Sequence, residues 1–414
     1  MATESGDAPS TDTFTRLYRS IPEGLGVPIA IVAVVIVPLT ALMWVLYVYW
    51  VANGEAVHGR IGTDYRAFET AGQLMWNHRA EALYDPASYA APYASAFSYP
   101  PWFALAMVPF GVLSYGIGYA VWMASTGTAF LVGHIWAGKW IGFAVGTIGA
   151  ATLFGYLNAR FGQSALLVGA LVAVGVVGAL RSNWVLAGIS VALLSFKPHL
   201  AFGLILALVL CRVVDRKKAL AFGFLITAGL FGIAELFTPG STVAWLDWVL
   251  HPTISLVDPV PGVSVVAAID ALVGSPMPLL LRFVPLAVAT VWVWSLTSRR
   301  AVDTGTLFLV AIGVVVAMGP HSLLYDALAM VPAFALVFMT RSDDRRRMLV
   351  AVTYAVATLT AAPFLQLVHT EALDRTVPVI SAVALISFVF FVGETLPKRD
   401  DMALSAGVGS DMGS

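Results

Sequence analysis

Apolar stretches recur along almost the whole chain, separated by short polar turns. They lie at about 28–50, 115–137, 140–157, 163–180, 184–196, 198–214, 219–237, 278–297, 304–318, 323–340, 347–366 and 376–393. A helix needs about 20 apolar residues to cross a bilayer, and inside the bilayer the backbone must satisfy its own hydrogen bonds. The pattern therefore predicts an all-α integral membrane protein, a polytopic helical bundle with about 12 transmembrane helices.

The two ends of the chain differ from this apolar interior. Residues 1–27 are polar and rich in Ser and Thr, and residues 396–414 follow the last apolar stretch. No small-residue cleavage site follows the first apolar stretch, which favours an uncleaved span over a signal peptide. We expect disordered cytoplasmic tails at 1–27 and 396–414 around a single transmembrane domain, 28–395.

Basic clusters between the apolar stretches predict the orientation. The segments DRKK (215–218), SRR (298–300), RSDDRRR (341–347) and PKR (397–399) belong on the cytoplasmic side by the positive-inside rule. This assignment places 51–100 and 238–277 outside and both termini inside. It also requires that one apolar piece between 101 and 196 does not cross. We expect that piece to be 101–113, as a short or re-entrant helix, although 184–196 is as short.

The two outer segments are long, and long connections are usually functional. In the first of them, Phe68, Ala71, Gly72 and Met75 recur at helical spacing among polar residues. This pattern predicts an amphipathic helix lying on the outer membrane face.

Composition narrows the class of protein further. Hydrophobic residues make up 59% of the 414-residue chain and charged residues 11%, whereas soluble domains carry roughly a quarter charged residues. The net charge of −1 gives no sign of nucleic-acid binding, and the single cysteine, Cys211, rules out a disulfide framework. Walker, dinucleotide-binding and GxSxG motifs do not occur. A substrate embedded in the membrane fits this chain best.

Polar residues at span ends are costly and therefore point to function. On the predicted topology one such set lies on the outer side. Its members are Asp64, Tyr65, Arg66, Asp85, Tyr99, Gln163, Lys197, His199, His321, Tyr325 and Asp326.

Asp64 has two interpretations of similar weight. Thr63 or Asp64 precedes a helical pattern, so either is a candidate N-cap. A carboxylate beside apolar surface is also a candidate general base toward a hydroxyl. Asp85, in LYDP, has the sequence of a turn residue.

The other candidates suggest anion binding. His321 and Tyr325 form an i, i+4 pair, and a histidine at a helix start is suited to a phosphate; a metal site would need more ligands. Lys197, in SFKPHL, is either a snorkelling lysine or a phosphate ligand. Gln163 is suited to a sugar hydroxyl or to capping a span.

Six segments together resemble a known family. They are GTDYRAFETAG, ALYDP, FSYPPWFALAMVPF, FGQSALLVGAL, AGISVALLSFKPHL and GPHSLLYDALAMVP, in this order between residues 62 and 332. The chain resembles glycosyltransferase family 87, the polyprenol-phosphate-mannose-dependent mannosyltransferases of the GT-C superfamily.

The resemblance implies an enzyme at the outer face of the cytoplasmic membrane. A polyprenyl-phosphate sugar would be its donor, and a lipid or glycan its acceptor. The leading acid of the first outer loop, here Asp64, would be the base, and His321 would contact the donor phosphate. We expect Lys197 and Arg66 to assist, with inversion at the anomeric carbon and without a cofactor or metal.

Two other functions compete with this one. A transporter or lipid flippase explains the spans and Lys197, although polar groups near the midplane and an internal repeat would be expected of it. A lipid-linked polysaccharide polymerase or ligase shares the substrate class but relies on outer-loop arginines, and 238–277 contains neither Arg nor Lys.

Overall fold

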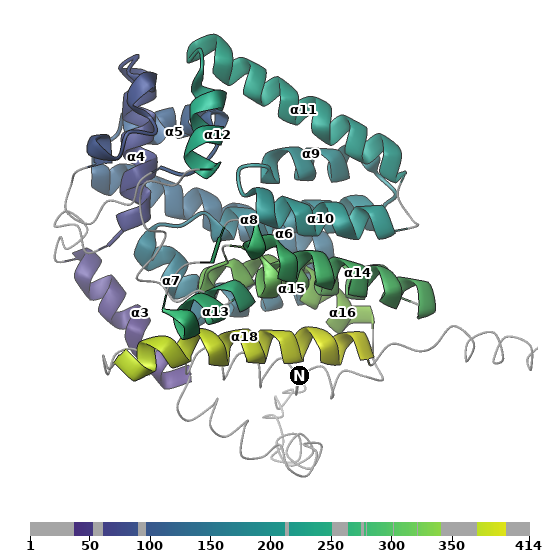
Figure 1. The fold of residues 1–414 in the computed structure, drawn as a ribbon. Coiled ribbons are helices and arrows are strands. Elements are labelled where there is room, and N and C mark those ends of the chain that lie inside the picture. The colour runs from purple at the N-terminus through teal and green to yellow at the C-terminus, as the bar shows by residue number, and fades with distance from the viewer. Residues whose placement is uncertain are drawn as a thin grey trace, which may run out of the picture.

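The computed structural model describes residues 37–52, 61–89, 97–211, 215–250, 264–274, 277–278, 280–300, 302–320, 322–340 and 371–394. Within these ranges every regular element is a helix, which agrees with the predicted all-α class (Figure 1). The predicted span 347–366 and both predicted tails lie outside the described residues.

The first half of the chain supplies the helices that carry most of the candidate residues. They are α3 (Val37–Ala52), α4 (Thr63–Trp76), the 3-10 turns η2 (Ala80–Ala82) and η3 (Pro86–Tyr89), α5 (Pro101–Gly111), α6 (Tyr115–Ala151), α7 (Leu153–Phe161), α8 (Ala165–Leu180), α9 (Trp184–Leu194) and α10 (Pro198–Leu210).

The second half continues the bundle. Its helices are α11 (Arg216–Phe237), α12 (Ser241–Leu250), α13 (Val265–Val273), η4 (Leu281–Phe283), α14 (Val284–Arg299), α15 (Thr304–Met318), η5 (Leu324–Met330), α16 (Val331–Thr340) and α18 (Glu371–Glu394).

Three helical stretches of the described chain are long and apolar enough to cross a membrane: Arg216–Phe237, Leu281–Arg299 and Thr376–Gly393. A fourth is reached if the bent pair Pro101–Gly111 and Tyr115–Trp140 forms one span. That pair turns by 119°, as a broken span or a re-entrant loop does. The other apolar helices are shorter, so the number of about 12 spans stays a prediction.

One predicted boundary is wrong. The expected helix 140–157 is interrupted at Thr152, whose backbone is extended (φ −69°, ψ 172°), and α7 begins only at Leu153. Thr152 Oγ1 donates to the Gly149 carbonyl (2.6 Å), which ends the preceding helix. The expected break near 138–140 appears as non-helical backbone at Gly138 and Lys139 inside α6.

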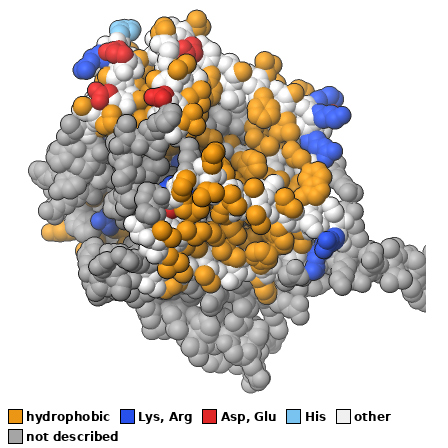
Figure 2. Space-filling view, viewed as in Figure 1, with side chains coloured by type: hydrophobic (Ala, Val, Ile, Leu, Met, Phe, Trp, Pro, Cys, Tyr) orange, Lys and Arg blue, Asp and Glu red, His pale blue; other side chains and the backbone are white. Residues whose placement is uncertain are grey.

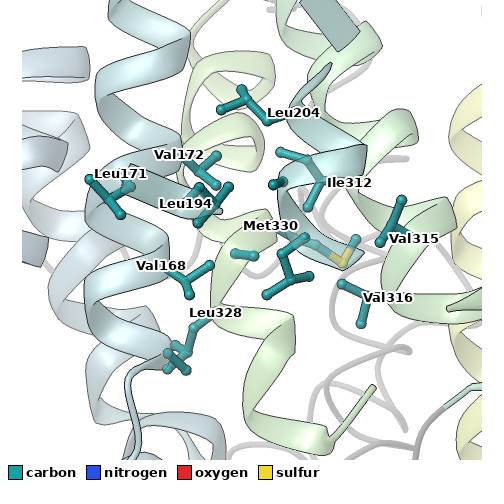
Figure 3. Close-up of a cluster of buried hydrophobic side chains, with 14 of the residues drawn as sticks. Val168, Leu171, Val172, Leu194, Leu204, Ile312, Val315, Val316, Leu328 and Met330 are labelled. Atoms are coloured by element: carbon teal, nitrogen blue, oxygen red, sulfur yellow. The ribbon is translucent and has the colours of Figure 1, made fainter. Parts of the chain in front are cut away.

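The core lies between α8, α10, α15 and η5. Helices α8 and α15 are apolar on all sides and are buried along most of their length, as expected of helices at the centre of a bundle. In Figure 3, Val168 of α8 lies toward Leu328 of η5, and Val172 lies beside Leu194 of α9. Leu204 of α10 and Ile312 of α15 belong to the same cluster.

Peripheral helices show the opposite pattern. In α11, Phe224, Leu225 and Leu236 are exposed, and Figure 2 shows apolar side chains over much of one face. Contiguous apolar surface of this kind is rare on soluble monomers and is typical of contact with lipid. The structure therefore has the character of a membrane protein.

The helix predicted in the first outer segment is present as α4. Its apolar residues Phe68, Ala71, Gly72 and Met75 are buried, and the helix packs against α5. The contact is close, because a Cβ added to Gly72 would lie 2.8 Å from the carbonyl carbon of Met107. This apolar face is therefore covered by α5 within the bundle.

Candidate functional site

Two glycines place Asp64 against the turn between α7 and α8. Gly62 and Gly162 both have left-handed backbone (φ +73° and +70°), which glycine adopts without steric cost. A Cβ added to Gly162 would lie 3.3 Å from the Gly62 Cα and 2.5 Å from the Tyr65 Cβ. The Gly62 N–H donates to the Arg160 carbonyl (2.7 Å). The start of α4 is thereby fixed beside Gln163.

Asp64 is the second residue of α4 and is buried, with 7% of its surface exposed. Gly62 occupies the N-cap position, so the interpretation of Thr63 or Asp64 as the N-cap is wrong. The Gln163 Nε2 donates to Asp64 Oδ2. A buried carboxylate held by an amide N–H is a suitable general base.

Tyr99 completes this hydrogen-bonded chain. Its hydroxyl donates to Gln163 Oε1 (3.2 Å), and its ring lies among those of Phe68 and Phe103, with centroids 5.1 and 5.2 Å away. Burial raises the pKa of Tyr99 to about 12, although Lys197 acts in the opposite direction. Tyr99 is therefore neutral and able to donate at physiological pH.

A buried ion pair lies beside this chain. Lys197 Nζ is 2.8 Å from Asp326 Oδ1, with side chains 7% and 2% exposed. The Leu323 N–H donates to Asp326 Oδ2 (3.0 Å), and His199 Nε2 lies 3.8 Å from the same oxygen. Lys197 also lies 5.2 Å from the Tyr325 ring centroid. Because its ammonium is enclosed and paired, the snorkelling interpretation is wrong.

Local sequence explains where the lysine lies. α9 ends at Leu194 and α10 begins at Pro198, which holds the first helical position and leaves Lys197 as the N-cap residue. Proline suits this position because its missing N–H has no helical partner there. The helix break expected at Pro198 is confirmed.

The hydrogen-bonded chain of Asp64, Gln163 and Tyr99 and the ion pair of Lys197 and Asp326 form one electrostatic cluster. Lys197 interacts with Asp326, Tyr99 and Asp64, and Tyr99 interacts with Lys197, Asp64 and Asp326. Five separate segments supply these residues: α4, the residues before α5, the α7–α8 turn, the α9–α10 turn and η5. The arrangement brings together a carboxylate that could accept a proton and an ammonium group that could attract an anion.

Three predicted residues lie elsewhere. The Arg66 guanidinium lies 4.1 Å from the Tyr115 ring centroid, and the buried Tyr65 hydroxyl donates to the Phe110 carbonyl (3.4 Å). Asp85 is exposed, and its carboxylate accepts from the Ala87 N–H (3.0 Å) in its own turn. His321 lies outside the described residues.

Two supporting residues were not identified from the sequence. Asn158 Oδ1 accepts from the Ala165 N–H (2.8 Å), which caps α8, and Trp122 Nε1 donates to the Gly162 carbonyl (3.1 Å). Both hold the turn that carries Gln163. A buried asparagine just ahead of a Gly-Gln-Ser turn is a weak signal, since its partner amides become apparent only in the folded structure.

Potential metal ligands do not gather in the described part of the chain. There, no group of three or more His, Cys, Asp or Glu side chains is arranged to hold a metal ion.

Comparison with known proteins gives one match. The family model described as glycosyltransferase family 87 matches residues 97–325, just over half of the chain. No curated protein matches the chain, and no solved structure does. The matched region includes Tyr99, Gln163, Lys197 and His199 and begins after Asp64.

Proposed function

Because the chain belongs to glycosyltransferase family 87 and is thus a glycosyltransferase, we propose that it uses a polyprenyl-phosphate sugar as donor. The transferred sugar is mannose, and the acceptor is a hydroxyl of a lipid or glycan. Transfer takes place at the outer face of the cytoplasmic membrane, in a fold of the GT-C type.

The observation that carries this proposal is the buried Asp64 carboxylate in one cluster with Lys197. A glycosyl transfer from a phosphate donor needs one base for the acceptor and positive charge for the departing phosphate. The cluster contains one group of each kind. It lies on segments that the predicted topology assigns to the outer side.

The reaction follows as a single displacement. The acceptor hydroxyl gives its proton to Asp64 while its oxygen forms a bond to the anomeric carbon. The bond from that carbon to the phosphate oxygen breaks, and polyprenyl phosphate leaves with the electron pair. The anomeric configuration is inverted. Phosphate needs no general acid to leave, unlike the leaving group in glycoside hydrolysis, where two carboxylates take part.

Lys197 and His321 are the proposed phosphate ligands, acting by electrostatic stabilisation of the departing anion. The Lys197 ammonium has three N–H bonds, and Asp326 Oδ1 accepts one of them. The ion pair keeps this charge in a buried site before the donor binds. Arg66 is also proposed, and its guanidinium lies 4.1 Å from the Tyr115 ring centroid.

The rival functions explain less. A transporter or flippase does not account for the family match, and a polymerase or ligase would need basic residues in the second outer segment. The arginine that follows this segment, Arg282 of η4, forms an ion pair with Asp270 (2.9 Å). Its charge therefore has a structural partner within the protein.

The test is sugar transfer by purified protein in detergent. Radiolabelled polyprenyl-phosphate mannose and a lipid or glycan extract are supplied to the wild type, Asp64→Asn and Asp85→Asn. We expect Asp64→Asn to lose on the order of 10²–10⁴-fold in rate and Asp85→Asn to match the wild type. The product linkage should be inverted relative to the donor.

Other outcomes lead elsewhere. Equal transfer by Asp64→Asn and the wild type would place the base at another carboxylate, with Asp326 tested next. No transfer by the wild type with several sugar donors and acceptors would favour the transporter.

A further inference from the structure

We propose that Gln163, held in place by Tyr99, is a positioning residue that orients the Asp64 carboxylate for proton abstraction. This inference rests on the proposed function, because it assumes that Asp64 is the base. In this proposal Gln163 acts on Asp64, whereas the sequence analysis suited it to binding a sugar hydroxyl or to capping a span.

The hydrogen bonds have a defined direction. Tyr99 donates to Gln163 Oε1, and Gln163 Nε2 donates to Asp64 Oδ2. If the amide were reversed, its oxygen would face the carboxylate, and two acceptors would repel each other. The Tyr99 O–H therefore selects the amide orientation that serves an ionised Asp64. Burial raises the pKa of Tyr99 to about 12, so the O–H that selects this orientation is present at working pH.

The charged neighbours of Asp64 also favour its ionised form. Lys197 interacts electrostatically with both Tyr99 and Asp64. The Tyr99 hydroxyl donates to the Gln163 amide oxygen, and the Gln163 amide N–H donates to Asp64. A hydrogen bond to the charged form of a carboxylate favours that form, so the chain holds Asp64 ready to accept a proton.

Charged and titratable groups also occur on α4 itself and on α6 and α7, which it contacts. On its own helix, the Arg66 guanidinium lies over Tyr115 of α6, and Glu69 interacts with Arg66. On α7, the Arg160 guanidinium lies 5.5 Å from the Phe161 ring centroid. The Tyr119 hydroxyl of α6 donates to the Ala159 carbonyl. Lys197 and Tyr99 both interact electrostatically with Asp64.

Steady-state kinetics separate positioning from substrate binding. Gln163→Met keeps the length of the side chain and removes the amide contacts with Tyr99, Asp64 and the Ser164 N–H. We expect roughly a tenfold or larger loss of kcat with KM nearly unchanged, because the lost interaction acts on the base and not on the substrate. Tyr99→Phe should show a smaller loss of the same kind. A sugar ligand at Gln163 would instead raise KM.

The pH profile gives a signature that a merely structural role would not. In Gln163→Met the acid limb of kcat/KM should move to higher pH, because the ionised carboxylate has lost a donor. Gln163→Glu places a second carboxylate beside Asp64, and two such groups share one proton. Its rate should therefore recover as the pH falls from neutral, while that of the wild type does not rise.

A double-mutant cycle tests the contact without activity. The thermal midpoints of Asp64→Asn, Gln163→Met and the double variant in detergent should be non-additive, because residues in contact couple. An inactive wild type would reject the proposed function, and the cycle would still test the contact. The positioning role alone would be overturned by a different pair of results. In that case Asp64→Asn would be inactive, while Gln163→Met would keep the wild-type kcat and the wild-type acid limb of its pH profile.

Discussion

Lys197 and Asp326 bring opposite charges together in an apolar interior. Each ion loses its hydration on burial, and that cost is offset only by its partner and by further hydrogen bonds. Asp326 has such a bond from the Leu323 N–H, and His199 lies nearby. The pair therefore depends on both members being present.

Removing one partner should be far more damaging than removing both. We expect Asp326→Asn or Lys197→Met to lower the free energy of unfolding by about 3–5 kcal/mol. The double variant Lys197→Met/Asp326→Leu should recover most of that stability, yet transfer no sugar because it lacks the ammonium. Unfolding in mixed micelles and the transfer assay measure the two effects.

Asp215 and Lys218 provide the matched control. They form an i, i+3 pair at the start of α11 (3.1 Å), but their side chains are 44% and 64% exposed. Asp215→Asn should leave stability nearly unchanged, because exposed ion pairs contribute little. A loss as large as that of Asp326→Asn would show that burial does not set the strength of these two ion pairs.

The candidate residues could be predicted from the sequence, but their contacts could not. Asp64, Gln163 and Lys197 stood out because polar groups at span ends are rare. Nothing local indicates that Gln163 would bind Asp64, since the contact depends on how α4 meets the α7–α8 turn. Arg66 was predicted beside the phosphate because it is close to Asp64 in sequence. Two helical positions turn a side chain by about 200°, and the Arg66 guanidinium lies over the Tyr115 ring. Its contact with the phosphate stays a prediction.

At the scale of elements, the contact between Gly62 and Gly162 joins α4 to the α7–α8 turn. Both residues have positive φ, and neither has room for a Cβ. The contact explains why two short segments far apart in the chain meet closely enough for their side chains to form a hydrogen bond.

Gly162→Ala is expected to weaken this junction. A left-handed alanine costs roughly 1–2 kcal/mol, and the added methyl must also displace Tyr65 or Gly62. Transfer should fall by more than stability alone explains, because Gln163 moves with the turn. Thermal unfolding and kcat of the purified variant measure both effects.

Gly127→Ala is the control for that change. Gly127 lies inside α6, and a Cβ added there meets nothing within 4 Å. Alanine is favoured over glycine in a helix by roughly 0.5–1 kcal/mol, so this variant should be as stable as the wild type or slightly more so. If Gly162→Ala and Gly127→Ala had the same stability and the same kcat, the contact between Gly62 and Gly162 would not be needed for stability or transfer.

Helix positions were predicted well where the sequence signal is local. α8, α9 and α15 begin and end close to the expected residues, because polar turns or proline bound them. The interruption at Thr152 was missed, since an apolar threonine-containing stretch gives no sign of extended backbone. The covered face of α4 was missed for a related reason. An amphipathic pattern shows that a face is apolar, but not whether lipid or α5 covers it.

At the scale of the whole molecule, charge is distributed unevenly. In Figure 2 a group of Lys and Arg side chains lies along one edge of the apolar face, while the acidic side chains visible in this view gather at upper left. The positive-inside rule assigns the basic edge to the cytoplasm. On that assignment we expect the α4 region, and with it Asp64, on the outer side.

Cysteine labelling tests this orientation. Cys211 is the single cysteine and is buried, with 2% of its surface exposed, so Cys211→Ser provides a cysteine-free background. We expect a membrane-impermeant maleimide to label Glu81→Cys in intact cells, and Lys217→Cys only after permeabilisation. Both positions are exposed. The reverse result would invert the topology and place the proposed chemistry in the cytoplasm.

The site is assembled from segments far apart in the chain, such as the two that meet at Gly62 and Gly162, and this has a consequence for biosynthesis. Asp64 leaves the ribosome long before Gln163, and Asp326 follows much later still. A chain emerging from its N-terminus therefore carries its proposed base through most of translation without the groups that hold it. The incomplete protein has no assembled site, and a nascent or truncated chain that reaches the membrane should be unable to consume its donor.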